Sequence, residues 1–186
     1  NLFFISGGAL AVENALKTAF DWKVRKNMAG GINSSDTPER ELKGQKVLHF
    51  QQCFHGRTGY TLALTNTFDP RKTQYFPKFA WPRVKNPKAR FPLEGKNLED
   101  VIAAEGEAIA QIERAFADNP DDIAAIIIEP IQGEGGDNHF RPEFLQALRE
   151  PRAHTFRLTR VIGDQHRAHH RDRRGGEGRG PTYAHR

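Results

Sequence analysis

The sequence lacks the features that would place it in several large classes of protein. Its single cysteine, Cys53, excludes an internal disulfide, and no cysteine and histidine spacing is typical of a zinc site. No apolar run approaches the roughly 20 residues that a membrane-spanning helix needs, and no segment resembles a signal peptide. We therefore expect a cytoplasmic protein. The first residue is asparagine rather than methionine, so we also expect the chain to begin inside a longer protein.

Charge is distributed very unevenly along the 186 residues. The net charge is +5, but nine of the 28 basic and only three of the 23 acidic residues lie in residues 151–186. This tail therefore carries +6, whereas residues 1–150 carry −1 and are not expected to bind nucleic acid. The tail is also rich in histidine and glycine and has no lysine. It is either a disordered segment translated in the wrong frame of a GC-rich gene or a basic arm that binds nucleic-acid phosphates.

The first 150 residues alternate between strand and helix patterns. An apolar, aromatic run at residues 1–6 favours a strand, and an amphipathic stretch at residues 9–27 favours a helix. Further strands are predicted at residues 46–53 and 123–130, and further helices at residues 58–67, 98–118 and 142–150. The run at residues 123–128 is continuously apolar, as in a strand covered on both faces. This order predicts an α/β fold with a mostly parallel sheet and flanking helices.

Three segments with ligand-binding chemistry follow the predicted strands: Gly7-Gly8, Cys53 to Arg57, and Glu129 to Gly136. Ligands of open α/β sheets bind outside the carboxyl ends of the strands, so we expect the three segments to converge there. The glycine pair opens a helix, and the free N–H groups and dipole of a helix start favour a phosphate. The alternative for this pair is a simple turn between strand and helix.

The other two segments carry side chains that suit a cofactor or an anionic substrate. Phe54 could lie flat on a planar ring, His55 could pair with a cofactor oxygen, and Arg57 could clamp a carboxylate with its planar fork. A core phenylalanine, a satisfied histidine and a solvated arginine are the structural alternatives. Glu129 ends a buried strand, where a carboxylate needs a partner. With Glu134 it makes only two acids, so no metal site is predicted.

Four stretches of the sequence are similar to one known family. They are FFISGGALAVENALKTAFDWK, FHGRTGYTLALTNT, YFPKFAWPRV and IIIEPIQGEGGDNHFRPEFLQALRE. Together they resemble the class III aminotransferases, which are pyridoxal-phosphate-dependent enzymes of fold type I, over residues 1–150. Within this family the branch that acts on the 6-amino group of lysine is the most similar. Enzymes of the family that use ornithine or 4-aminobutyrate are the alternatives, because residue spacing does not select the amine donor.

The resemblance implies a fold, a cofactor and a reaction. Residues 1–150 would form part of the large domain that binds pyridoxal 5'-phosphate. The substrates would be L-lysine and 2-oxoglutarate, and in actinomycetes the product would supply 2-aminoadipate for β-lactam antibiotics. Five residues would contact the cofactor: Gly8 and Ala9 at its phosphate, Phe54 on its ring, His55 beside the ring, and Glu129 in the hydrogen-bonded network beneath it.

The resemblance also implies substrate contacts and missing parts. Arg57 would hold the α-carboxylate of lysine, and Glu134 would pair with an arginine near the C-terminus that otherwise binds the carboxylate of 2-oxoglutarate. In the family, the lysine that forms the Schiff base lies beyond the matched region, and none of the ten lysines here occupies its context. We therefore expect an inactive fragment of a homodimeric enzyme, with residues 68–95 contributing to the dimer.

Overall fold

The structure is a computed structural model that describes residues 2–149 and 160–163. Its main sheet contains four parallel strands in the order β2-β1-β3-β6. These strands are β1 (Lys46–Phe50), β2 (Arg83–Val84), β3 (Ile123–Ile128) and β6 (Arg160–Gly163). A small antiparallel pair consists of β4 (Ile131–Gln132) and β5 (Asn138–His139). No helix in the described part of the chain is long and apolar enough to span a membrane.

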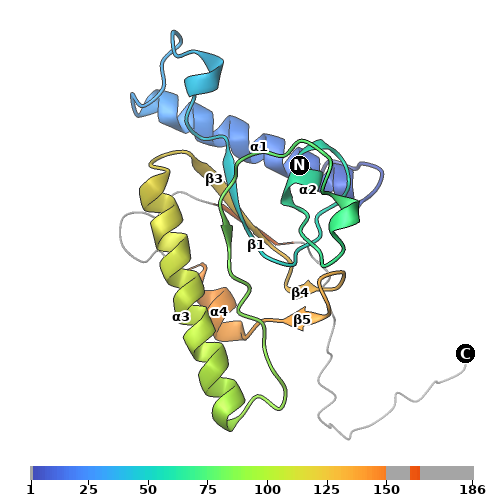
Figure 1. Cartoon of the computed structure of the whole chain (residues 1–186). Coiled ribbons are helices and arrows are strands. Elements are labelled where there is room, and N and C mark those ends of the chain that lie inside the picture. Colours follow the sequence, from blue (N-terminus) through green and yellow to red (C-terminus); the bar gives the residue numbers. More distant parts are fainter. Residues whose placement is uncertain (1, 150–159, 164–186) are drawn as a thin grey trace, which may run out of the picture.

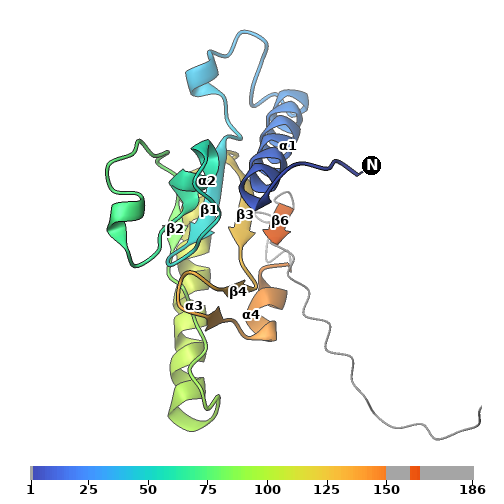
Figure 2. The same cartoon turned by 90° about the vertical axis from the view of Figure 1, so that its right-hand side faces the viewer.

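Helices cover both faces of the sheet, as Figures 1 and 2 show. One face carries α1 (Gly8–Ala29) and α2 (Gly59–Leu64), and the other carries α3 (Gly95–Asp118) and α4 (Pro142–Ala147). Two short 3-10 helices, η1 (Glu39–Glu41) and η2 (Pro70–Lys72), lie in the connections. The predicted α/β fold, with a parallel sheet and flanking helices, is confirmed.

The central strand β3 shows why its sequence is apolar throughout. All six residues are buried, because α1 covers one side of the strand and α3 the other. Ile127 packs with Val12 and Leu16 of α1, whereas Ile126 and Ile128 belong to the cluster around α3. Complete burial of one such side chain contributes roughly 1.5–3 kcal/mol, so this run stabilises the whole sheet.

The strand predicted at residues 1–6 and the predicted start of the helix at residues 98–118 are wrong. Residues 2–5 form no strand within the described chain, and the side chains of Leu2 and Phe4 are 87% and 88% exposed. Their composition favours a strand, but a strand also needs a hydrogen-bonded neighbour, and none of the described strands pairs with them. The helix predicted at residues 98–118 starts earlier, at Gly95, so that Asn97 lies inside its first turn.

The described part of the tail contains a strand that the sequence pattern did not predict. Arg160–Gly163 forms β6 and pairs in parallel with β3, with Gly163 opposite Ile128. Four residues are too few to show a periodicity by which a strand could be identified. The other predictions for the tail, a disordered or frame-shifted segment or a basic arm, fall on residues 151–159 and 164–186, which lie outside the described ranges.

Candidate active site

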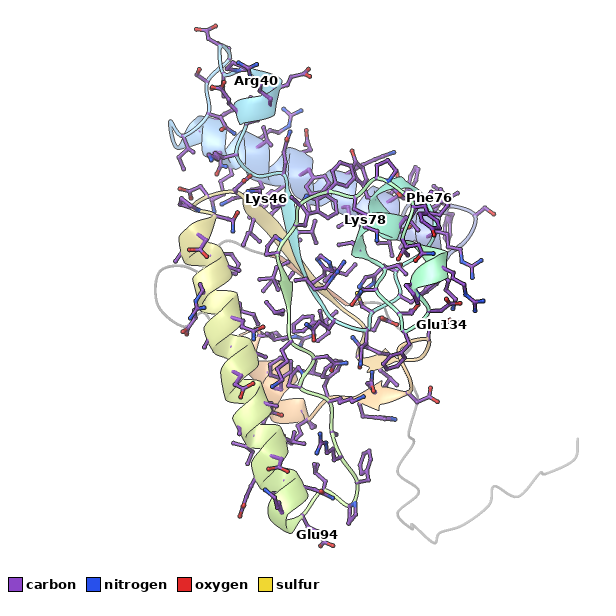
Figure 3. All side chains as sticks on the ribbon, viewed as in Figure 1. Arg40, Lys46, Phe76, Lys78, Glu94 and Glu134 are labelled. Carbon is purple, nitrogen blue, oxygen red and sulfur yellow. The ribbon has the colours of Figure 1, made fainter. Side chains whose placement is uncertain are left out.

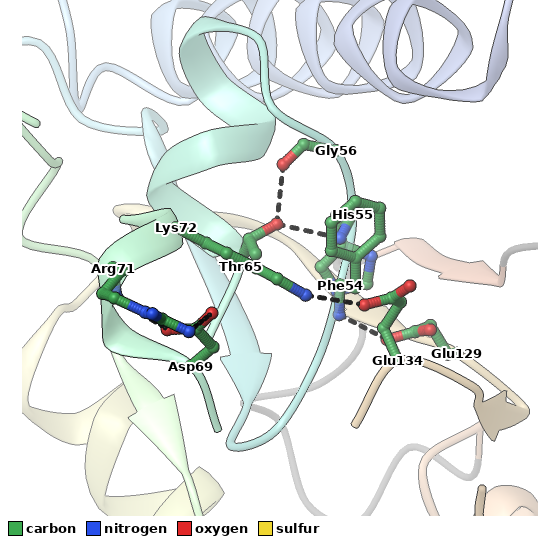
Figure 4. A network of polar contacts seen from close by, with 9 residues as sticks. All are labelled: Phe54, His55, Gly56, Thr65, Asp69, Arg71, Lys72, Glu129 and Glu134. Carbon is green, nitrogen blue, oxygen red and sulfur yellow. Dashed lines mark hydrogen bonds and ion pairs between the residues drawn. The ribbon is translucent and has the colours of Figure 1, made fainter. Parts of the chain in front are cut away.

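The three segments expected to share one edge of the sheet do converge there. The backbone N–H of Phe54, after β1, donates a hydrogen bond of 2.7 Å to the Glu129 carboxylate, after β3 (Figure 4). A Cβ atom at Gly56 would lie 2.7 Å from the Cβ of Ala9, so this loop also presses against the first turn of α1. The loops are therefore in direct contact with one another and with the helix start.

The start of α1 has the properties of an anion site. The helix begins at Gly8, and the preceding Gly7, at φ 85°, provides no side-chain cap. A Cβ atom at either glycine would meet nothing within 4 Å. Because the first N–H groups of a helix have no partner within the helix, they are available to a phosphate that enters this open space. The residues present therefore fit the phosphate of a cofactor.

The loop after β1 is held in place by a buried threonine. Thr65 Oγ1 accepts a hydrogen bond from the N–H of His55 at 3.1 Å and donates to the carbonyl of Gly56 at 2.8 Å. Figure 4 shows this link between the loop and the end of α2. Thr65 was not predicted as a site residue, since a threonine at the end of a short helix carries no distinctive signal. It fixes the backbone from which Phe54 and Arg57 extend.

The side chains of this loop differ strongly in exposure. Phe54 is half-buried, His55 is buried, and Arg57 is exposed without an ion pair among the described residues. Neither ring nitrogen of His55 has a hydrogen-bond partner within the described chain. Burial lowers the pKa of His55 to about 4, so the imidazole is neutral at pH 7. Arg57 is therefore the charged group that this loop presents to a ligand.

A second buried histidine lies beneath the site, on β1. His49 Nε2 accepts a hydrogen bond of 2.9 Å from Arg83 Nε. Burial, and after it the charge of Arg83, lowers the pKa of His49 to about 3. The ring is therefore neutral, and its lone pair is used to hold Arg83 against the sheet.

The two acids of the third segment are in different environments. Glu129 is half-buried and bonded to Phe54, whereas Glu134 is exposed and forms an ion pair with Lys72 of η2 at 2.9 Å (Figure 4). The hydrogen bond from Lys72, together with the charges of Lys72 and Arg57, lowers the pKa of Glu134 below its ordinary value. Figure 3 shows Glu134 on the same side of the molecule as Phe76, away from Glu94.

Lys72 was missed by the sequence analysis because it is far from Glu134 in the chain and no short pattern connects them. The arginine near the C-terminus that was expected to pair with Glu134 stays a prediction.

Comparison with known proteins decides the family. A sequence model described as aminotransferase class-III matches residues 1–154. The chain belongs to the class III aminotransferases. These enzymes depend on pyridoxal phosphate, in agreement with the predicted cofactor and enzyme class. The resemblance found in the four sequence stretches is thus confirmed for the family.

Individual members of the family differ in how similar they are to this chain. The L-lysine-epsilon aminotransferase of Mycobacterium tuberculosis is 54% identical over 150 residues, which are 81% of this chain and 31% of that protein. The 4-aminobutyrate aminotransferase of Emericella nidulans is 32% identical over 160 residues, covering 80% and 31%. A solved structure of the M. tuberculosis lysine aminotransferase, in the internal aldimine form, has 54% identity and a TM-score of 0.71, covering 80% and 32%. The chain therefore spans about a third of the length of these class III aminotransferases.

Proposed function

We propose that this chain supplies the phosphate-binding and carboxylate-binding parts of a lysine 6-aminotransferase. The reaction would convert L-lysine and 2-oxoglutarate into 2-aminoadipate 6-semialdehyde and L-glutamate. One observation carries the proposal: the uncapped start of α1 and the loop that bears Arg57 are in contact at the carboxyl edge of the sheet. The identity to a lysine aminotransferase, well above that to the 4-aminobutyrate enzyme, favours lysine as the amine donor.

Different residues at this edge of the sheet would contact different parts of the cofactor. The N–H groups of Gly8 and Ala9 would bind the phosphate, Phe54 would cover the ring, and Glu129 would keep the Phe54 backbone in position. His55 would contribute as a neutral group beside the ring. Bound pyridoxal phosphate supplies an aldehyde that accepts the amino group and a ring that withdraws electrons. The protein contributes orientation and charge.

Substrate carboxylates would be bound by Arg57. A guanidinium can hold a carboxylate through two parallel hydrogen bonds, and Arg57 is not occupied by an ion pair among the described residues. With the α-carboxylate of lysine at Arg57, the far 6-amino group could reach the cofactor. Glu134, whose charge is balanced here by Lys72, would regulate access of the α-carboxylate of 2-oxoglutarate to the arginine near the C-terminus.

The remaining predictions belong to the same proposal. They are a homodimeric full-length enzyme located in the cytoplasm, a large domain that includes residues 1–150, and use of the product for β-lactam antibiotics. This chain alone would bind ligands but would not catalyse transamination, since it lacks a lysine in the context of the Schiff-base residue.

A stable conjugate tests the proposal without catalysis. In ε-(phosphopyridoxyl)-L-lysine, the 6-nitrogen of lysine is joined to the cofactor by a reduced bond, so the compound spans both halves of the site. Its affinity for the chain is measured by fluorescence titration beside that of phosphopyridoxyl-pentylamine, which lacks both the α-carboxylate and the α-amino group. Arg57→Ala is expected to weaken the lysine conjugate about tenfold or more, because a charged hydrogen bond is lost, and to leave the pentylamine conjugate unchanged.

Arg71→Ala is the matched control, because Arg71 is exposed and already paired with Asp69. The proposal would be wrong if the chain bound neither conjugate, or if Arg57→Ala weakened both equally. Conjugates made from ornithine and 4-aminobutyrate test the alternative amine donors in the same assay.

A further inference from the structure

Helix α1 places a buried carboxylate against a neighbouring helix. Glu13 is only 9% exposed, and it lies between two core residues of the same helix, Val12 and Leu16. Its Oε1 accepts hydrogen bonds from the Thr58 hydroxyl at 2.8 Å and from the Thr61 N–H at 3.3 Å. A buried acid is costly unless it is hydrogen-bonded, so these two bonds define where the carboxylate can lie.

The same bonds determine where α2 begins. Thr58 precedes the helix, and the N–H of Thr61 is one of the first-turn donors that lack a partner within a helix. Glu13 satisfies this donor from outside, and its negative charge lies at the positive end of the helix dipole. The Thr58 N–H donates in turn to Thr61 Oγ1 at 3.1 Å. Thr58 is therefore attached to α1, and Arg57 is the residue immediately before it.

A second contact fixes the loop on the other side of Arg57. Gly56 has φ 134°, and a Cβ atom there would lie 2.6 Å from Thr61 Oγ1 and 2.7 Å from the Ala9 Cβ. Ala9 and Glu13 are four residues apart and therefore adjacent on one face of α1. The residues before and after Arg57 thus both rest on that face. The first turn of the same helix carries the N–H groups assigned to the phosphate.

We propose that Glu13 is a positioning residue that fixes the distance between the phosphate-binding start of α1 and Arg57, and thereby selects substrates by chain length. The inference depends on the proposed function. A substrate held by its carboxylate at Arg57 must reach the cofactor with its far amine, and lysine is one methylene longer than ornithine. A fixed span favours one length, whereas a loop released from Glu13 would accept both.

The test compares two conjugates of different length. Affinities for ε-(phosphopyridoxyl)-L-lysine and δ-(phosphopyridoxyl)-L-ornithine are measured on the chain and its variants. The unaltered chain is expected to prefer the lysine conjugate about tenfold, the effect of one misplaced methylene. Glu13→Ala should bring this ratio close to one, whereas Glu13→Gln, which keeps an acceptor oxygen, should retain most of it. Asp21→Ala, at an exposed acid of the same helix, should leave the ratio unchanged.

Two further measurements separate positioning from general damage. Phosphopyridoxyl-pentylamine lacks the carboxylate, so its affinity measures binding of the cofactor part alone. This affinity should be the same for the unaltered chain and for Glu13→Ala. Thr58→Val removes the donor on the loop side while Glu13 stays in place, and it should lower the lysine-to-ornithine ratio as Glu13→Ala does.

The outcomes are distinct. Two results would overturn the positioning role: equal weakening of all three conjugates by Glu13→Ala, or a lysine-to-ornithine ratio that neither Glu13→Ala nor Thr58→Val changes. In either case, binding that depends on Arg57 would still support the proposed function. Equal affinity of the unaltered chain for the two amino-acid conjugates would overturn it as well. Failure of the unaltered chain to bind any conjugate would overturn both proposals.

Discussion

The two faces of the sheet are held together by different interactions. On the α3 side a large apolar cluster forms the core, and the bidentate ion pair of Glu105 with Arg141 lies beside it. On the α1 side buried polar groups are interspersed with the apolar ones. They include Glu13, His49, His55, Thr61 and Thr65.

This difference follows from the nature of the two kinds of contact. The free energy gained by burying apolar surface is proportional to the buried area and does not depend on direction. It therefore stabilises the fold without specifying the position of any one loop. Hydrogen bonds have a narrow range of length and angle, so buried polar groups fix the loops that carry Phe54 and Arg57. The α3 face should therefore govern stability, and the α1 face should govern ligand binding.

The largest expected effect tests the apolar face. Ile112 of α3 is fully buried, and Ile112→Ala should lower the free energy of unfolding by about 2–5 kcal/mol through lost contacts and a cavity. Urea denaturation measures this loss. The affinity of the folded chain for the lysine conjugate should stay the same. Ile102→Ala, at a residue of the same helix that is 48% exposed, should cost much less. A large change in affinity for Ile112→Ala would remove the distinction between the faces.

The next effect addresses the loop between β1 and α2, on the α1 face. Gly56→Ala places a Cβ atom too close to Thr61 and Ala9, at a φ that side chains rarely adopt, and should destabilise the chain by about 1–3 kcal/mol. Unlike Ile112→Ala, it should also weaken the lysine conjugate, because the loop must move away from α1. Gly133→Ala is the control, since a Cβ atom there meets nothing within 4 Å. Equal effects of the two glycine variants would contradict the close packing described for this loop.

The last effect is a dependence of stability on pH that arises from the α1 face. His49 and His55 have folded-state pKa values lowered to about 3 and about 4, below the ordinary 6.5. Between pH 6.5 and about 4 the unfolded chain binds protons that the folded chain does not. The free energy of unfolding should therefore fall as the pH decreases, by about 1.4 kcal/mol per pH unit for each histidine.

Urea denaturation between pH 6.5 and 5 measures this slope, and His49→Asn or His55→Asn should each remove about half of it. His139→Gln, at an exposed histidine outside the α1 face, should leave it unaltered. A slope that both single variants preserve would show that these histidines are not the buried neutral groups described.

The elements that could be predicted from sequence are those whose pattern is long or uniform. The apolar run of β3 and the amphipathic α1 each contain enough residues to reveal their burial. Proline at the first position of α4 marked that helix as well. The convergence of the loops after β1 and β3 also followed, because parallel strands bring their carboxyl ends to one edge. The same argument does not account for Gly7-Gly8, because no described strand precedes α1.

What could not be predicted depends on contacts between distant residues. The run at residues 1–6 has the composition of a strand, but composition does not reveal whether a neighbouring strand is available. The roles of Glu13 and Lys72 arise from partners on other elements, Thr58 and Glu134, to which no local pattern connects them. Family resemblance assigned Glu134 a different partner, so resemblance alone would not have revealed the contact with Lys72.

The glycine-rich segment after β3 has a consequence for attempts to change substrate preference by mutagenesis. At Gly135 a Cβ atom would lie 1.9 Å from the Gln52 carbonyl oxygen, so no other amino acid fits unless the two loops separate. At Gly133 the space is open. A randomised library that holds Gly135 constant and varies Gly133 would explore new side chains beside Glu134 while keeping most of its members folded.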